Sequence, residues 1–115
     1  MLAPQHRLTS AEDFRRTIRS GSKTVTPTVV IHCALSNSPN PSRFGITVSK
    51  AVGGSVIRHR VARQIRHAIA DVLRSERLSV PPGSRWVVRA LPQAASGGAA
   101  RDVHVGMTRL LGKVR

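Results

Sequence analysis

The chain has 115 residues, of which 19 are Lys or Arg and five are Asp or Glu, giving a formal net charge of +14. Its hydrophobic fraction of 40% argues against a disordered chain, and its length suits one compact domain. A single cysteine leaves no disulfide and no cysteine-based metal cluster. Because no segment has the apolar run of a signal peptide or membrane span, we expect a soluble cytoplasmic protein without membrane contacts. A charge this high usually implies a polyanionic partner.

The first predicted element is a short helix ending near Arg19, after a basic lead-in over residues 1–7 that we expect to be flexible. The sequence Thr9-Ser10-Ala11-Glu12 is typical of a capping box, with the threonine as N-cap and the glutamate bonding back to it. Phe14 and Ile18 lie one turn apart on one face. Such a pair most often belongs to a core, although it could also offer bases an apolar surface.

Two β-strands follow, over residues 28–35 and 43–49, joined by a turn rich in proline and asparagine. Residues 23–26 are extended or loop, and Pro27 limits regular pairing there. Side chains alternate between the two faces of a strand, so His32 lies on the face opposite to Ile31. We therefore expect an outward-facing histidine that is available to a ligand.

The longest predicted helix runs from about Ser55, its expected N-cap, to Arg74 or Arg77. Apolar residues recur at every fourth position and predict one buried face. These residues are Ile57, Val61, Ile65, Ile69 and Leu73.

Arginines dominate the first three turns of this helix, and no acid appears before Asp71. A helix N-terminus carries partial positive charge and disfavours arginine, so folding alone does not explain the pattern. A phosphate ligand does explain it, because free N–H groups, the dipole and guanidinium groups all attract phosphate. A solvated basic face is the commoner reason for a charge run. The acid-free turns and the preceding glycine pair favour the ligand; the arginines are Arg58, Arg60, Arg63 and Arg66.

The rest of the chain predicts a strand over residues 84–91, a flexible loop over 92–98, a helix over 99–111 and a tail over 112–115. Trp86 in the strand is expected to pack in the core. The element order is helix, two strands with a possible third, helix, strand and helix. This order predicts one α/β (α+β) two-layer sandwich over the whole chain.

No catalytic set is visible in the sequence. The five acids form no acid/base or two-metal constellation, and the five histidines show no metal-ligand spacing. No nucleophile elbow, Walker loop or dinucleotide fingerprint is present. We therefore expect no self-contained active site, and no metal or small-molecule cofactor bound by the protein alone. His59 and His67 are expected to join the arginines in binding.

The segment FGITVSKAVGGSVIRHRVARQIRHAI, residues 44–69, resembles the signature of the bacterial ribonuclease P protein component. That family has a strand ending in Val-Ser-Lys, a glycine-containing turn and a helix of the form R-N-R-x-x-R-x-x-R. Here the strand ends at Val48-Ser49-Lys50 and the turn contains Gly53-Gly54. The segment RLTSAEDFRRTIRSG, residues 7–21, is similar to the first helix of the family, and the resemblance extends to Leu111.

The resemblance implies a ribosomal-protein-like fold with a left-handed crossover through the arginine helix. It also implies a subunit that binds a catalytic RNA and precursor tRNA, while the RNA and its Mg²⁺ ions remove the 5′ leader. The RNA-binding residues would be Lys50, Arg58, His59, Arg60, Arg63, Arg66 and His67. A cleft between the first helix and the sheet would hold the leader, lined by Phe14, Ile18 and His32.

Some residues depart from the family pattern. His59 stands where asparagine is usual, Ala62 where a basic residue is frequent, and Ile18 and His32 where aromatic residues are frequent. Three other classes remain open: a ribosomal or general structural RNA-binding protein, a protein-only nuclease and a DNA-binding helix-turn-helix protein. The missing carboxylate cluster disfavours the nuclease, and the strands around the arginine helix disfavour the last class.

Overall fold

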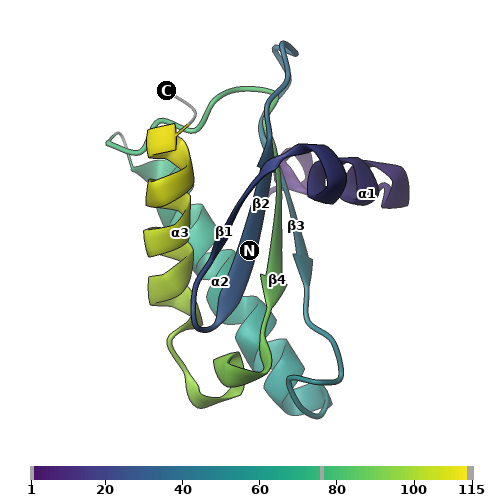
Figure 1. Cartoon of the computed structure of the whole chain (residues 1–115), viewed down its shortest axis with the longest axis vertical. Helices are drawn as coiled ribbons and strands as arrows, with labels where there is room; N and C mark the ends of the chain where they lie inside the picture. The colour runs from purple at the N-terminus through teal and green to yellow at the C-terminus, as the bar shows by residue number, and fades with distance from the viewer. Residues whose placement is uncertain (1, 76, 114–115) are drawn as a thin grey trace.

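The structure is a computed structural model that describes residues 2–75 and 77–113. Within these residues the chain forms three α-helices, two 3-10 helices and a four-stranded sheet of order β1-β2-β4-β3 (Figure 1). This arrangement confirms the predicted fold class, and the extended segment before the first predicted strand is itself a strand. The elements are η1 Pro4–His6, α1 Ala11–Ser20, β1 Ser22–Val25, β2 Val29–Ala34, β3 Arg43–Thr47, α2 Ser55–Arg74, β4 Arg85–Ala90, η2 Pro92–Ser96 and α3 Ala99–Lys113.

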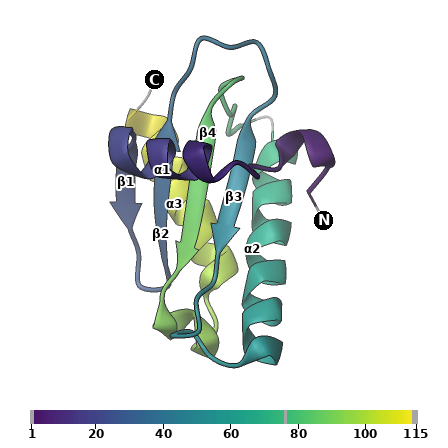
Figure 2. The same cartoon turned by 90° about the vertical axis from the view of Figure 1, so that its right-hand side faces the viewer.

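The sheet is mixed. β2 pairs antiparallel with β1 and β4, whereas β3 pairs parallel with β4. Neighbouring parallel strands need a crossover, and here α2 supplies it behind the sheet (Figure 2). The crossover is left-handed, although about 98% of such connections are right-handed. Along the chain, α2 begins a short loop after the end of β3.

The core lies between the sheet and the layer formed by α2 and α3 (Figure 1). Trp86 is fully buried there, as predicted, and its ring stacks on Phe44 with 5.8 Å between the ring centroids. On α2 the buried positions are Val61, Ile65, Ala68, Ile69 and Val72.

The predicted apolar face of α2 needs a correction at both ends, where Ile57 and Leu73 are only half-buried. Steps of four residues overshoot a full turn by about 40° at about 100° per residue, so a row of four such steps drifts off the core. Ala68 and Val72 are buried in addition to the middle of the row.

α1 lies across the other face of the sheet, at one end of it (Figure 2). Its Phe14 ring sits on Gly45 of β3, where an added Cβ would come within 2.2 Å of the ring. Gly45 therefore allows α1 to approach the strand this closely. Val25 of β1, on the same face, is 57% exposed, so the face is only partly covered.

Both predicted helix caps shift by one residue. The N-cap of α1 is Ser10, whose Oγ accepts a hydrogen bond from the Asp13 backbone N–H at 3.3 Å. Glu12 pairs with Arg15 at 2.9 Å instead of bonding back to a threonine. α2 is capped by Gly54 and not by Ser55, and no side chain accepts a hydrogen bond there. Its first N–H groups therefore have no side-chain acceptor.

The basic lead-in makes contacts with the fold, and its Met1 lies outside the described residues. Leu2 is 5% exposed, His6 Nδ1 lies 2.8 Å from the Ser42 carbonyl oxygen, and Arg7 forms a β-bridge with Phe44. Residues 2–7 thus lie against β3. At the other end α3 continues to Lys113, and residues 114–115 of the predicted tail lie outside the described part of the chain.

Asp102 connects α3 to the β1–β2 hairpin. It is 4% exposed, and its Oδ2 accepts hydrogen bonds from Thr28 N at 3.1 Å and Thr28 Oγ1 at 2.6 Å. We expect Asp102→Ala to lower the free energy of unfolding by about 2–4 kcal/mol, because two buried donors lose a charged acceptor. The exposed Asp71→Ala is the control, with an expected change of about 0.5 kcal/mol. Urea midpoints measure both, and equal shifts would contradict this role of Asp102.

Candidate nucleic-acid interface

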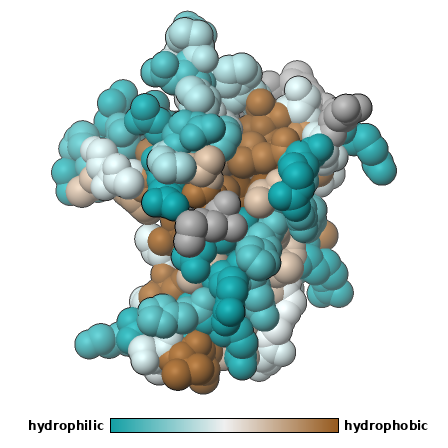
Figure 3. Space-filling view, turned by 180° about the vertical axis from the view of Figure 1, so that it is seen from behind, coloured by the Kyte–Doolittle hydropathy of each residue, from teal (hydrophilic) through white to brown (hydrophobic). Residues whose placement is uncertain are grey.

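The outer face of α2 carries a row of basic side chains that no described acid neutralises. His59, Arg60, Arg63 and His67 are exposed there, and Lys50 is exposed in the turn before the helix. Among the described residues none of these five forms an ion pair, and hydrophilic side chains cover this helix in Figure 3. The first acid on α2 is Asp71, which pairs with Arg74. The face therefore attracts anions over the first three turns.

Two further predicted arginines are half-buried at the margin of this face. Arg58 has its Nε buried without a hydrogen-bond partner in the described chain. Arg66 lines a cavity of about 450 Å³ at the edge of β3, together with Arg7, Phe14 and Phe44. The structure thus places a predicted RNA-binding residue and a predicted cleft residue in one cavity wall.

Arg60 lies toward the other margin of α2. One of its terminal nitrogens donates a hydrogen bond to the Ala95 carbonyl oxygen of η2 at 2.9 Å. This bond holds the side chain against the protein without neutralising its charge. Arg63 makes no such contact among the described residues, so it is the arginine of the set most free to meet a ligand.

The start of α2 adds a second source of positive potential. Its first turn contains no acid, and Gly54 provides no side-chain cap. The helix dipole therefore adds its partial positive charge to that of the neighbouring arginines. This agrees with the sequence pattern, in which folding alone gave no reason for arginine at these positions.

The predicted cleft residues lie in three different environments. Phe14 is half-buried over Gly45, and Ile18 is 43% exposed, so Ile18 is not the core residue that its spacing would suggest. His32 is only 6% exposed, which corrects the expectation of an accessible histidine. It lies between Lys23 and Val87 on the two neighbouring strands of a sheet face that α1 partly covers.

His32 is nevertheless unusual for a buried residue. Neither ring nitrogen has a hydrogen-bond partner among the described residues. Burial lowers the pKa of His32 from its ordinary value of 6.5, and the positive charges of Arg89 and Lys23 lower it further. The ring is therefore neutral at pH 7 and has one donor and one acceptor nitrogen.

Two cations on the sheet face that α1 partly covers were not among the predicted site residues. Lys23 is the register partner of His32, and Arg89 is the register partner of Val30. Both are exposed. The alternation within residues 84–91 could have indicated Arg89, because it places Arg85 and Arg89 on one face of the strand.

The described chain offers neither a metal site nor a membrane-spanning helix. Over residues 2–75 and 77–113, no group of three or more His, Cys, Asp or Glu could hold a metal ion. No helix in the same part of the chain is long and apolar enough to cross a membrane.

A basic α/β domain with an unneutralised arginine helix is the architecture expected of a nucleic-acid-binding protein. Comparison with known proteins gives the family. The family model described as "Ribonuclease P" matches residues 2–114. The ribonuclease P protein component of Streptomyces bikiniensis is 41% identical over 123 residues, covering 97% of both chains. That of Corynebacterium diphtheriae is 41% identical over 120 residues, covering 96% of this chain and 97% of the relative.

Solved structures agree in fold. The ribonuclease P protein of Staphylococcus aureus superposes with a TM-score of 0.73 at 21% identity, covering 96% of this chain and 95% of that one. The Thermotoga maritima protein gives 0.70 at 20% identity, covering 95% and 97%. The chain belongs to the ribonuclease P protein family. It is thus a protein subunit of ribonuclease P, the endoribonuclease that processes the 5′ end of precursor tRNA, which confirms the predicted function.

The environment of His32 predicts a pH dependence of stability. Folding lowers the pKa of His32, so the unfolded chain binds the proton more readily, and the free energy of unfolding falls as the pH drops below about 6.5. We expect His32→Gln to lose less stability than the original chain between about pH 7 and pH 5. Urea midpoints at the two pH values measure this, and equal losses in both chains would show that His32 does not contribute.

Proposed function

We propose that the outer face of α2 binds the catalytic RNA of ribonuclease P. The observation that supports this is that the arginines in the first three turns of α2 have no carboxylate partner in the described chain, beside a helix start without an acid or a side-chain cap. Guanidinium groups suit phosphate, because they donate two parallel hydrogen bonds and keep their charge. The contact set is Lys50, Arg58, His59, Arg60, Arg63, Arg66 and His67.

The face of the sheet beside α1 is proposed to hold the single-stranded 5′ leader of precursor tRNA. Phe14 and Ile18 offer apolar surface, while Lys23 and Arg89 lie close enough to His32 to affect its charge and could attract the leader phosphates. His32 belongs to this proposed face by its position on β2; because both of its ring nitrogens are buried, it would support the face rather than stack on a base.

In this proposal the protein contributes electrostatics and the RNA performs the hydrolysis. Mg²⁺ would be bound mainly by RNA phosphates, since four of the five acids, those in the described chain, are engaged in ion pairs or in the core. Cations on α2 would lower the phosphate repulsion that Mg²⁺ must otherwise screen. The complex would work in the cytoplasm without a small-molecule cofactor.

The assembly test is cleavage of a precursor tRNA with the chain alone, the RNA alone and both together. At limiting Mg²⁺ we expect cleavage only with both. Arg63→Gln should reduce this cleavage and lower the slope of log affinity against log salt by about 1, since one phosphate contact is lost. Its stability should change by no more than about 0.5 kcal/mol, as for other exposed positions.

Arg109→Gln on α3 is the matched control, because Arg109 is also exposed and its side chain also forms no hydrogen bond or ion pair within the described chain. It should cleave normally. If Arg63→Gln and Arg109→Gln behave alike in both measurements, α2 is not the RNA-binding face. Cleavage by the chain without RNA would contradict the proposal that the RNA performs the hydrolysis.

The leader site predicts a gain of affinity. Ile18 is 43% exposed, so Ile18→Phe adds an aromatic surface without disturbing the core. Stacking on one base contributes about 1–3 kcal/mol. We therefore expect Ile18→Phe to tighten binding of precursor tRNA with a leader by at least about fivefold, and to leave binding of mature tRNA unchanged. Val105→Phe on α3, where Val105 is 37% exposed, is the control. Equal effects on the two tRNAs would place the leader elsewhere.

A further inference from the structure

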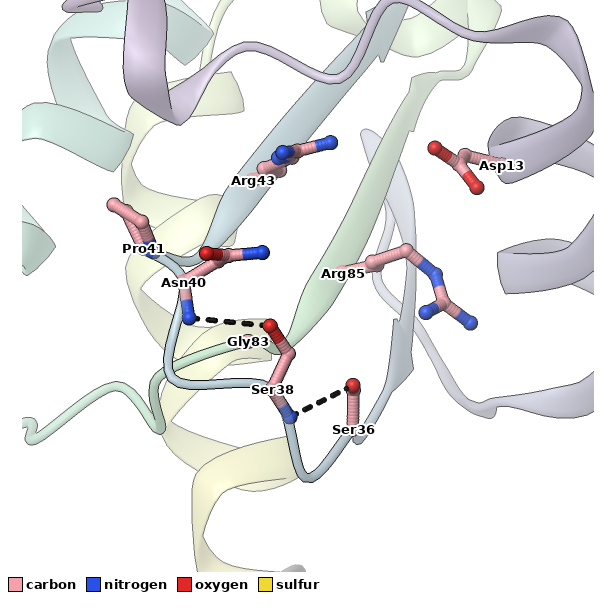
Figure 4. A pocket seen from close by; sticks show the side chains of 8 residues that line it. All are labelled: Asp13, Ser36, Ser38, Asn40, Pro41, Arg43, Gly83 and Arg85. Atoms are coloured by element: carbon pink, nitrogen blue, oxygen red, sulfur yellow. Dashed lines mark hydrogen bonds between the residues drawn. The ribbon is translucent and has the colours of Figure 1, made fainter.

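A small polar cavity lies at the end of the sheet where β2 ends and where β3 and β4 begin (Figure 4). Its volume is about 150 Å³, equal to the share of about five water molecules in the liquid at about 30 Å³ each. None of its wall residues belongs to the contact sets proposed above. The wall is formed by Asp13, Ser36, Ser38, Asn40, Pro41, Arg43, Gly83 and Arg85.

Two arginines from neighbouring parallel strands meet in this cavity. Arg43 and Arg85 are register partners, so their backbones are about 4.8 Å apart and their side chains leave the same face of the sheet. Like charges placed opposite each other are destabilising. Within the described chain neither forms an ion pair; Arg85 Nε donates to Thr17 Oγ1 at 3.3 Å, and its terminal nitrogens remain unused.

Two serine hydroxyls add donors beside the arginines. Ser36 Oγ accepts from the Ser38 N–H and Ser38 Oγ accepts from the Asn40 N–H, both at 3.1 Å (dashed lines in Figure 4). A hydroxyl that accepts a hydrogen bond still has its own proton to donate. Neither proton has an acceptor among the described residues, so both can be donated to a ligand.

The fold holds this loop in place. The Gly83 N–H donates to the Asn40 carbonyl oxygen at 2.6 Å, and Gly83 has a φ of +76°. A Cβ there would come within 2.4 Å of the Ser38 carbonyl oxygen. The turn before β4 therefore packs directly on the loop between β2 and β3, which fixes the serines near the arginines.

One acid shares the cavity wall. Asp13 Oδ1 lies 3.9 Å from Arg16 Nη1, a long and partly exposed pair. With two arginines and one aspartate, the wall keeps a formal charge of +1. The wall thus contains four hydrogen-bond-donating groups, two guanidinium groups and two hydroxyls, and only one carboxylate. This composition suits a tetrahedral oxyanion.

We propose that the cavity formed by Arg43, Arg85, Ser36 and Ser38 binds a phosphate group. The phosphate belongs either to an RNA backbone or to free inorganic phosphate; the RNA source rests on the proposed function. The cavity lies where the five-residue strand β3 begins. Along the chain it is separated from the start of α2 by this strand, about 16 Å long at about 3.3 Å per residue, and by the loop over residues 48–54. An RNA that reached both would follow the length of the sheet.

The RNA arm of the test measures how the affinity of the chain for catalytic RNA and precursor tRNA depends on salt. Arg43→Gln and Arg85→Gln should each lower the slope of log affinity against log salt by about 1, whereas Arg109→Gln should leave it unchanged. Arg43→Lys, which keeps the charge, should restore most of the slope. Thermal melting follows folding in parallel. If Arg85→Gln unfolds after losing Thr17, Arg43→Gln decides the test, because Arg43 has no side-chain hydrogen bond within the described chain.

The second arm titrates inorganic phosphate at constant ionic strength and follows the Arg43 and Arg85 Nε–Hε signals by NMR. Saturable shifts that Arg43→Gln abolishes support free phosphate as the ligand. A reduced RNA slope without saturable shifts supports the RNA backbone. If neither the slope nor the signals respond, the proposal is wrong.

Two further variants make the outcome specific. Asp13→Asn removes the acid from the wall and should tighten whichever binding is found, so weaker or unchanged binding would overturn the proposal. The salt dependence of RNA affinity is also measured for Arg63→Gln. If the slope changes in Arg63→Gln but not in Arg43→Gln or Arg85→Gln, the cavity does not bind the RNA backbone. A slope that responds to none of them defeats the proposed function, while the phosphate titration still decides the cavity.

Discussion

The structure depends on one helix that has to satisfy two opposite demands. α2 buries Val61, Ile65 and Ile69 completely in the core, and its outer face carries arginines that no described acid neutralises. Burial of three large aliphatic side chains contributes several kcal/mol, at about 1.5–3 kcal/mol each, whereas repulsion among exposed cations is screened by water and salt. The apolar face therefore determines where the helix sits, and the charged face is free to be shaped by binding.

The left-handed crossover determines where that charged face lies. Because α2 leaves β3 at the edge of the sheet and returns in β4, its outer margin runs beside the edge strand. Arg66 thereby reaches the cavity that contains Phe14 of α1, from the opposite layer of the molecule. The proposed RNA-binding face of α2 and the proposed leader face are thus continuous around β3. One ligand could contact both without a change in the protein backbone.

Most of the fold, and the arginine set, could be predicted from local patterns. The strand alternation, the fourfold apolar repeat and the acid-free turns of α2 each depend on neighbouring residues. The strands and the acid-free turns reappear in the structure, whereas the buried repeat is kept in the middle of α2 and lost at both ends. His32 could not be predicted in this way. Its burial depends on β1 and β4 flanking β2 and on α1 crossing the face, and these contacts join segments distant in sequence. The cap at Ser10 was missed for a local reason: two adjacent hydroxyl residues compete for the position, and only the backbone decides between them.

The distribution of acids explains why the charge remains unbalanced after folding. Glu12, Asp13 and Asp71 each pair with an arginine three residues later on their own helix. Asp102 is buried and satisfied by Thr28. No described acid is therefore left to face the first three turns of α2, and Asp13, the one acid in the cavity wall with Arg43 and Arg85, leaves that wall a formal charge of +1. A protein with this distribution carries self-repulsion that a bound polyanion would relieve, so RNA binding and stability should be linked. The repulsion destabilises the free subunit, and a phosphate bound at either proposed site would reduce it.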